Sequence, residues 1–422
     1  MTAVPEMNLK EDLGDLGSQV WWQGRDRIQP YVFCARVGDD VAARARARSI
    51  WAAQSAQATQ NLGIDTCLVG GVKKLPFPAL KPGFRAKSKR YLAKLYNIEA
   101  DFDVRILHSN PVEKLLPEDH PLVTEHGEWE FRFEVPRTVL PFAKLVHTRD
   151  PRLAAQCLKA GIRVIYEDHD EEFQVAGRPE IAELFESPHA AAIVAITSEV
   201  ASRLEEHGVP SQKILVADSG VNRRAFRYCR QRTNTWRKFL LEDRYKHLVS
   251  YSGGLQLERG IDQIMETARS SPDTMFAIMG GNKSDNHMWK SFTRSENITN
   301  VKYFGFVDQK DVCDIQKACD AVLYTRSHEG RPGVTSPLKM FEYLASGAPI
   351  VSAVIPALTH MKNKDLAITW YDPSDASSLG ESLQRCFRDF PRREELYEQN
   401  RALAQQFTWE ERQKKILTFA DF

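Results

Sequence analysis

The amino-acid sequence predicts an α/β protein in which two Rossmann-like domains face each other across a cleft. Short apolar runs of strand length alternate with longer helical patterns, which is typical of parallel sheets covered by helices. This alternation occurs twice along the 422 residues, and it fails between Asn222 and Lys246, where Arg, Asn, Thr and Tyr are frequent. Two successive arrays with an interrupted join indicate two domains.

The first array begins at Tyr31, after a tail over residues 1–30 that lacks apolar periodicity. Its predicted strands cover residues 31–37, 65–69, 103–107, 144–147, 164–167, 192–197 and 213–217. Its predicted helices cover residues 41–62, 150–160, 178–186 and 199–207. These elements form an N-terminal domain over residues 31–222, which a linker or excursion over residues 223–245 follows.

The second array forms a C-terminal domain over residues 246–390. Its predicted strands cover residues 247–250, 275–279, 300–304, 321–324 and 350–354. Its predicted helices cover residues 260–270, 308–318 and 337–346. A final amphipathic helix within residues 391–422 is a candidate to pack back on the N-terminal domain.

Composition and charge exclude several classes of protein. Hydrophobic residues make up 42% and charged residues 27% of the chain, and the formal net charge is +1, so no charge excess points to nucleic acid. No stretch approaches the roughly 20 apolar residues that span a bilayer, and the polar start lacks a secretory pattern. The seven scattered cysteines contain no C-x-x-C pair, which favours reduced thiols over a disulfide framework or a structural zinc site. We therefore expect a cytoplasmic enzyme.

The most informative segment is the predicted helix that ends at Gly347. Ser336 before Pro337 marks its start, because serine caps a helix and proline is favoured at the first helical position. Free backbone N–H groups at such a start favour a phosphate, and Lys339 in the first turn gains nothing from the helix dipole unless an anion is bound there. Glu342 lies one turn further and can accept two hydrogen bonds from a vicinal diol such as a ribose. The alternative is an ordinary capped helix with a solvated Lys–Glu pair.

Glycines at two strand ends supply further candidate positions. The first strand of the second array runs into Gly253 and Gly254, which permit close backbone approach to a ligand. Arg259 stands at the mouth of the next helix, where it can clamp diphosphate oxygens. Gly280 follows the 275–279 strand in the same way. A plain strand–helix connection is the alternative for each.

Three segments in order, SGGLQLERGID, FGFVDQKDVCDIQKACDAVLY and TSPLKMFEYLASGAPIV, resemble the C-terminal domain of family-4 glycosyltransferases of the GT-B fold. The run VAITSEVASRLEEHGVPSQKILVADSGVNRRAF resembles the segment that joins the two domains of that family. The resemblance covers roughly residues 140–360. It implies a retaining transferase that moves a sugar from a nucleotide diphosphate sugar to an acceptor, with no obligatory metal and no further cofactor.

The resemblance also implies roles for individual donor-site residues. The family's ribose-binding carboxylate corresponds to Glu342, and its catalytic cation to Arg259. The phosphate-facing amides correspond to the helix start at Thr335, Ser336, Pro337 and Leu338. We expect Lys339 to join Arg259 in stabilising the departing diphosphate.

The sequence departs from the family pattern at two positions. Val334 stands where many members carry a glutamate, and Gly254 stands where many carry an arginine. Lys339, Arg326 and Arg331 are candidates to replace the missing cation.

His169 is the candidate from the N-terminal domain, at the end of the 164–167 strand, where the family places a histidine that contacts the donor sugar. The alternative is a capping histidine in an acidic loop. A metal site built from residues 168–171 is disfavoured, because four adjacent residues cannot all point at one ion. Gly38 and Arg149 close other strands and are candidates for the acceptor side of the cleft, although a structural role fits each equally well.

The predicted partners are a nucleotide-sugar donor and an acceptor that is a glycan, a lipid or a small polyol. The basic loop over residues 73–90 also carries Leu75 and Phe77, and it is a candidate for peripheral membrane contact. Alternative functions are a catalytically silent sugar-nucleotide-binding subunit, which the two departures favour, and a GT-B-type epimerase. The sequence leaves the nucleotide base, the sugar and the oligomeric state open.

Overall fold

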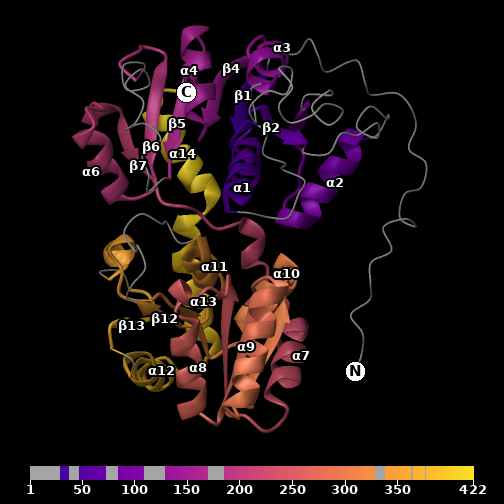
Figure 1. Ribbon diagram of the computed structural model, residues 1–422, viewed down its shortest axis with the longest axis vertical. Coiled ribbons are helices and arrows are strands. Elements are labelled where there is room, and N and C mark those ends of the chain that lie inside the picture. The colour runs from indigo at the N-terminus through magenta and orange to yellow at the C-terminus, as the bar shows by residue number, and fades with distance from the viewer. Residues whose placement is uncertain are drawn as a thin grey trace, which may run out of the picture.

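Two parallel sheets form the framework of the chain, one in each domain (Figure 1). A computed structural model describes residues 29–37, 47–72, 84–108, 129–169, 185–327, 338–362, 365–375 and 377–422. The domains are stacked along the long axis of the molecule, and the predicted α/β class with two Rossmann-like domains is confirmed.

The N-terminal domain contains a seven-stranded sheet in the order β3-β2-β1-β4-β5-β6-β7. Its strands are β1 (Gln29–Cys34), β2 (Thr66–Val72), β3 (Asp103–His108), β4 (Ala143–Thr148), β5 (Arg163–Asp168), β6 (Ala190–Ala195) and β7 (Ile214–Val216). Its helices include α1 (Ala47–Asn61), α2 (Phe84–Tyr96), α3 (Val135–Thr138), α4 (Pro151–Lys159) and α6 (Ser198–Glu206).

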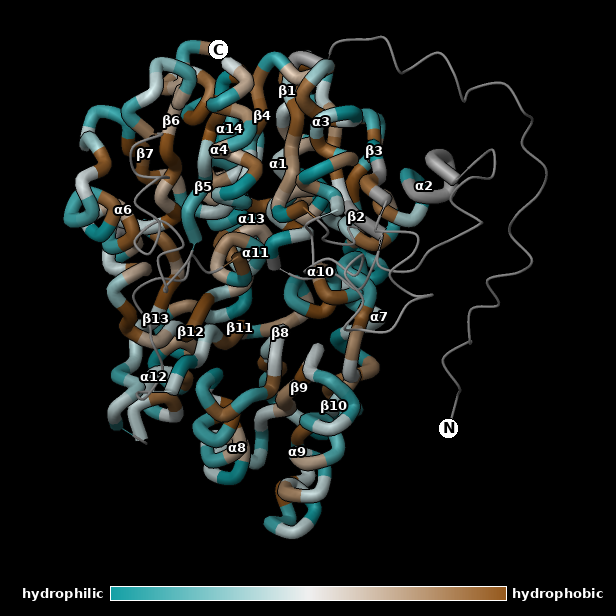
Figure 2. The backbone as a smooth tube through the Cα atoms, turned by 45° about the horizontal axis from the view of Figure 1, so that its top comes forward, coloured by the Kyte–Doolittle hydropathy of each residue, from teal (hydrophilic) through white to brown (hydrophobic). Residues whose placement is uncertain are grey.

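Alternating side chains of this sheet enter two separate cores. Val32 and Val146 pack on one face with residues of α4 and α6, whereas Phe33 and Leu145 pack on the other with α1 and α2. Successive strand residues point to opposite faces, so a strand buried on both faces is apolar throughout. Figure 2 shows this as hydrophobic colour along β1, β4 and β6.

The C-terminal domain contains a six-stranded sheet in the order β10-β9-β8-β11-β12-β13. Its strands are β8 (His247–Gly253), β9 (Thr274–Gly280), β10 (Val301–Gly305), β11 (Ala321–Tyr324), β12 (Ile350–Ala353) and β13 (Ile368–Tyr371). Its helices are α7 (Arg230–Leu241), α8 (Ile261–Ser270), α9 (Lys283–Ser295), α10 (Gln309–Ala318), α11 (Leu338–Ser346), α12 (Ser378–Asp389) and α13 (Glu394–Ala404).

Both sheets reverse their strand order at a comparable place, between β1 and β4 and between β8 and β11. Ligands of open α/β sheets bind in the crevice at the carboxyl ends of strands beside such a reversal. The ends of β8 and β4 therefore mark where a ligand site is expected in each domain.

The last helix, α14 (Trp409–Phe419), leaves the C-terminal domain and packs on the N-terminal sheet (Figure 1). Its side chains Trp409, Ile416 and Leu417 are buried in the core that α1 shares. Two crossing segments connect the domains: the first, at Gly220, leads into the C-terminal domain, and the second, just before Trp409, leads back to α14. A Cβ atom on Gly220 would lie 2.8 Å from the backbone N of Trp409, so the two crossing segments are in direct backbone contact.

The structure corrects two expectations about the connections. Residues 223–245, expected as a linker or excursion without regular structure, contain α7, whose Leu240 is buried in the C-terminal core and whose Arg237 pairs with Asp320 at 3.0 Å. The single helix expected within 391–422 is two helices, because the chain leaves helical geometry at Thr408, whose side chain caps α14.

Other differences concern elements without a clear pattern in the sequence. Helices α9 and α12 and strand β13 were not expected. Residues 84–90 of the predicted basic loop form the start of α2, because Arg, Lys and Ala favour a helix there. Of the predicted helix 178–186, residues 185–186 lie in a turn and the rest lies outside the described residues. Within the described part of the chain, no helix combines the length and apolarity needed to cross a bilayer.

Candidate functional site

Glycines bring the ends of β8 and β9 into contact at the cleft edge of the C-terminal sheet. Gly253 has φ +143° and Gly280 has φ +106°, conformations that side-chain-bearing residues rarely adopt. A Cβ on Gly280 would lie 2.2 Å from the carbonyl O of Gly253, and the N–H of Gly281 donates to that same oxygen at 2.9 Å. The glycines therefore let the backbones of the two strand ends approach each other closely, and the predicted approach of a ligand to this edge stays a prediction.

Lys339 extends from the first turn of α11 over this glycine edge. A Cβ on Gly253 would lie only 2.2 Å from Lys339 Nζ, so the lysine occupies space that glycine leaves. The ammonium donates to Tyr251 Oη at 3.1 Å and lies 4.4 Å from the centroid of that ring. Both contacts direct the positive charge toward the end of β8.

Three cations, Lys339, Arg259 and Arg326, gather beside the glycine edge. Burial, followed by the charges of Arg259 and Arg326, lowers the pKa of Lys339 well below its ordinary value. Burial and the charge of Arg326 also lower the pKa of Arg259. Among the residues that the structure describes, none of the three cations forms an ion pair. Such a cluster is stabilised when an anion binds.

Arg259 is held by the turn between β8 and α8. Gly260 has φ +69° and ends the short 3-10 helix Leu257–Arg259, and the carbonyl of Arg259 accepts a hydrogen bond from Thr325 Oγ1 at 2.7 Å. This bond ties the turn to the end of β11. Arg326 follows directly, and its Nε donates to Tyr324 Oη at 3.3 Å.

Glu342 lies one turn beyond Lys339 on α11. Burial raises the pKa of Glu342 to about 7, although the hydrogen bond from Gln309 and the charge of Lys339 oppose the rise. Gln309 Nε2 donates to one carboxylate oxygen at 2.9 Å, which leaves acceptor capacity for a ligand. Sequence analysis missed Gln309 because it lies 33 positions away in another helix.

A cavity of about 550 Å³, within the range typical of ligand sites, is bordered by Lys339, Gln309 and Glu342 but not by Arg259 or Arg326. It is lined by Ser252, Gly253, Gly254, Gln256, Met279, Gly280, Gly281, Asn282, Phe306, Val307, Gln309, Val312, Leu338, Lys339 and Glu342, and by Ile50 of α1. Because Ile50 belongs to the N-terminal domain, the cavity lies between the two domains. The structure thus brings together the predicted donor positions Gly253, Gly254, Gly280, Leu338, Lys339 and Glu342.

In the N-terminal domain, His169 and Arg149 directly follow β5 and β4, and neither lines the cavity described above. Both contact Trp51 of α1: the His169 ring centroid lies 5.9 Å from that of Trp51, and the Arg149 guanidinium carbon lies 5.7 Å from it. Burial lowers the pKa of Arg149 to about 10, although the charge of Glu167 opposes this. His169 and the cationic side chain of Arg149 therefore lie close to the same tryptophan.

Several predicted positions lie outside the described residues: Gly38, Arg331, Val334, Thr335, Ser336, Pro337 and residues 73–83 of the basic segment. The predicted roles of these residues, and membrane contact through the basic segment, stay predictions. Within the described part of the chain, no group of three His, Cys, Asp or Glu side chains could hold a metal ion.

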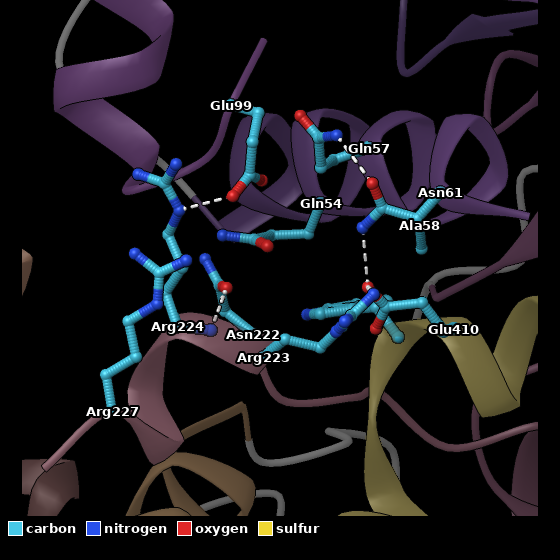
Figure 3. Close-up of a pocket in the computed structure, with 11 residues that line it drawn as sticks. Gln54, Gln57, Ala58, Asn61, Glu99, Asn222, Arg223, Arg224, Arg227 and Glu410 are labelled. Atoms are coloured by element: carbon cyan, nitrogen blue, oxygen red, sulfur yellow. Dashed lines mark hydrogen bonds and ion pairs between the residues drawn. The ribbon is translucent and has the colours of Figure 1, made fainter. Parts of the chain in front are cut away.

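A second, polar cavity of about 320 Å³ lies beside the domain crossings (Figure 3). Arg224 Nε donates to Glu99 at 2.7 Å and Asn61 Nδ2 donates to Glu410 at 2.7 Å. Asn222 Nδ2 donates to the carbonyl of Asn97 at 2.7 Å. These bonds connect both crossing segments to the N-terminal domain, so they help to fix the domain arrangement that shapes the cleft.

Comparison with known proteins shows what the C-terminal domain is similar to. Residues 232–403 match the model of the family described as "Glycosyl transferases group 1". These residues form a glycosyltransferase group 1 domain. A curated relative, the putative teichuronic acid biosynthesis glycosyltransferase TuaH of Bacillus subtilis, is 24% identical over 151 residues, which are 36% of this chain and 37% of TuaH.

Solved structures resemble nearly the whole chain. Anabaena HepE in complex with UDP is 14% identical, with TM-score 0.67, and the similarity covers 93% of this chain and all (100%) of HepE. Sucrose-phosphate synthase from Thermosynechococcus elongatus is 15% identical, with TM-score 0.65 over 93% of this chain and 98% of the synthase. A glycosyltransferase from Rickettsia africae is 14% identical, with TM-score 0.64 over 93% of this chain and 98% of that protein. The chain has the GT-B fold.

The residues that match the family model include the predicted donor-site residues placed above. The glycine edge, Arg259, Lys339 and Glu342 all lie within residues 232–403. His169 and Arg149 belong to the other domain, so the cleft combines a family domain with an N-terminal domain that the family model leaves unmatched.

Proposed function

We propose that this protein transfers a sugar from a nucleotide diphosphate sugar, bound by the glycosyltransferase group 1 domain, to an acceptor bound by the N-terminal domain. The cluster of Lys339, Arg259 and Arg326 at the glycine edge carries the proposal. Lys339 lines the cavity of about 550 Å³, and Arg259 and Arg326 are close enough for their charges to lower its pKa. Among the described residues none of the three has an ion-pair partner, so the cluster suits a bound diphosphate.

The same cluster explains how the reaction would be accelerated. Negative charge develops on the diphosphate as the bond to the sugar breaks. Fixed cations in a partly buried site stabilise that charge, and the loss of one such group typically costs about 3–4 kcal/mol of the barrier. We assign this role to Arg259 and Lys339, and no metal or further cofactor is part of the proposal.

Glu342 binds the other end of the nucleotide in this proposal. Its free acceptor capacity, beside the cavity and one helical turn from Lys339, suits the two hydroxyls of a ribose. HepE was solved with UDP and with UDP-glucose, so uridine diphosphate sugars are the first donors to test.

We also propose that transfer retains the configuration of the sugar. Inversion needs a base that deprotonates the acceptor on the face opposite the leaving group. His169 is the candidate base from the N-terminal domain, but burial and the charge of Arg149 lower its pKa to about 3, too low for efficient general-base catalysis near pH 7. This low basicity supports retention. A glycan, a lipid and a small polyol remain candidate acceptors, with Arg149 and Gly38 as candidate contacts.

Thermal denaturation with UDP, GDP and ADP tests the donor site directly. A nucleotide present at 100 times its Kd stabilises the native state by about 2.7 kcal/mol. We expect one nucleotide to raise the Tm of the wild type and to have a much smaller effect on Lys339→Met.

Hydrolysis of the matching nucleotide sugar, followed by NMR of the released sugar, then tests turnover and stereochemistry. Slow release with retained anomeric configuration supports the proposal. Inversion contradicts retention, tight nucleotide binding without turnover contradicts the transferase function, and no binding by any nucleotide contradicts the donor site.

A further inference from the structure

A buried polar network lies directly beneath His169 in the N-terminal domain. Its centre is Glu167, near the end of β5, whose side chain is completely buried. His147 Nε2 lies 2.9 Å from one carboxylate oxygen, and Arg412 Nη2 lies 2.7 Å from the other. His169 Nε2 contacts that second oxygen as well. One carboxylate thus meets two imidazoles and a guanidinium.

Glu167 is ionised in this setting. Burial alone would raise the pKa of Glu167, but the charge of Arg412 and hydrogen bonds from His147 and His169 hold it well below its ordinary value. An ionised carboxylate can only accept hydrogen bonds. Both imidazoles must therefore carry a proton on Nε2.

The two histidines are both neutral. Burial lowers the pKa of His147, and burial with the charge of Arg149 lowers the pKa of His169 to about 3. A neutral imidazole that carries its proton on Nε2 has a free lone pair on Nδ1. In His147 that lone pair accepts the hydroxyl of Tyr31, 3.0 Å away.

The Nδ1 atom of His169 has no such partner among the described residues. Its side chain keeps 12% of its surface exposed, at the carboxyl end of β5, whereas His147 is completely enclosed. The network therefore leaves the Nδ1 atom of His169 as a hydrogen-bond acceptor at the cleft edge of the N-terminal sheet.

We infer that Glu167, together with Arg412, positions His169 as a neutral hydrogen-bond acceptor for a hydroxyl group of the donor sugar. This inference rests on the proposed function. Glu167 and Arg412 are positioning residues, since they act on the sugar only through His169.

Arg412 connects this positioning to the domain crossing. It lies on α14, and its Nε donates to the carbonyl of Asp218 at 2.7 Å, while Nη2 also donates to Ala217 at 3.2 Å. These bonds hold the guanidinium of Arg412, which follows the second crossing segment, against the backbone of the first crossing segment. The orientation of His169 depends on a helix that enters the N-terminal domain from the other half of the chain.

The tautomer of His169 tests the inference without any activity measurement. NMR of protein labelled with ¹⁵N-histidine, assigned with His169→Gln and His147→Gln, distinguishes protonated from unprotonated ring nitrogens. We expect His169 to carry its proton on Nε2 between pH 6 and pH 8, and Glu167→Gln to increase the population protonated on Nδ1. A protonated Nδ1 or an imidazolium at pH 7 in the wild type would overturn the inference.

Kinetics then test the consequence for the donor sugar. We expect Glu167→Gln to lower kcat for nucleotide-sugar hydrolysis about 10- to 100-fold with little change in nucleotide affinity, by analogy with the loss of carboxylates that orient metal-bound histidines. The double variant Glu167→Gln/Arg412→Met removes both charges, so it restores the charge balance and should regain Tm but not kcat.

These outcomes separate the inference from the proposed function. If Glu167→Gln or a correctly folded double variant keeps kcat within twofold of the wild type, the positioning role is wrong and the transferase function stands. If the wild type has the expected tautomer but turns over no nucleotide sugar, the tautomer assignment stands, and both the transferase function and the action of His169 on a donor sugar are wrong.

Discussion

Replacing Gly253 by alanine tests whether the glycine edge and Lys339 act as one unit. The added Cβ would lie 2.2 Å from Lys339 Nζ and 2.5 Å from Cε. Because ordinary contacts begin at 3.4 Å, the ammonium must move by about 1.2 Å, the difference between 3.4 Å and 2.2 Å. A displacement of about 1 Å in a positioned group can lower the rate about 100-fold, so we expect kcat/KM to fall by that factor.

The same substitution also strains the backbone, and this second effect needs its own control. A residue with a side chain at φ +143° costs on the order of 1–3 kcal/mol, which would lower the Tm by several degrees. Gly305→Ala is the matched control, because Gly305 ends β10 with φ +66° and a Cβ added there would have nothing within 4 Å. Nucleotide-sugar hydrolysis and Tm should be measured for both variants. If Gly253→Ala loses no more activity than Gly305→Ala, the link between the glycine edge and Lys339 is wrong.

Three further predictions follow from the same geometry. Lys339→Met should raise the Tm of the unliganded protein, because it removes a buried cation that faces two other cations. The same variant should lower kcat by about 100- to 1,000-fold in hydrolysis assays. An unchanged kcat would contradict the catalytic role of Lys339. The KM for the donor should rise as the pH falls through about 7, because Glu342 becomes protonated there. When KM is measured from pH 5.5 to 8.5, Glu342→Gln should lose this pH dependence, whereas the control Glu258→Gln should keep it. Gly220→Ala should lower the Tm by several degrees, because its Cβ would meet the backbone of Trp409 at 2.8 Å. Gly380→Ala is the control and should leave the Tm unchanged, because the nearest atoms to its Cβ lie at 4.0 Å. Equal Tm values for the two variants would refute the close contact between the crossing segments.

The pH dependence of stability at Glu342 has a defined sign. The folded pKa of Glu342, about 7, is above its ordinary value of 4.5, so the folded state binds the proton more tightly than the unfolded state. The side chain therefore destabilises the fold as the pH rises from 4.5 through 7. Chemical denaturation at pH 5 and pH 8 should show a smaller loss of stability for Glu342→Gln than for the wild type.

Local patterns in the sequence predicted the parts of the site that lie close together in the chain. Lys339 and Glu342 share one helix, and Gly253 and Gly254 directly follow a strand, so spacing alone placed them. Contacts between distant segments left no such signal. Tyr251 lies 88 positions from Lys339, and its ring meets the lysine only because β8 and α11 pack together.

Helices and strands were predictable where burial of one face spaces the apolar residues regularly along the chain. They were missed where polar residues interrupt that spacing or where a break leaves it unchanged. Helix α7 was missed because its Arg and Thr residues outnumber its apolar ones, although Arg232 and Arg237 pair with acids of the C-terminal domain. The break before α14 was missed because Thr408 interrupts the helix without disturbing the apolar spacing around it. Glu167 and Arg412 lie 245 positions apart, so their ion pair depends entirely on tertiary structure.

The placement of α14 has a consequence for how this protein is made. A ribosome releases residues 31–222 long before residues 409–419, yet Trp409, Ile416 and Leu417 complete the core beside α1. Until they arrive, the first half of the nascent chain leaves that apolar surface uncovered, where chaperones can bind it. In the described part of the chain, the core of the C-terminal domain is built from residues from 221 onward, so it does not depend on α14. The half that is synthesised later can therefore complete its folding first.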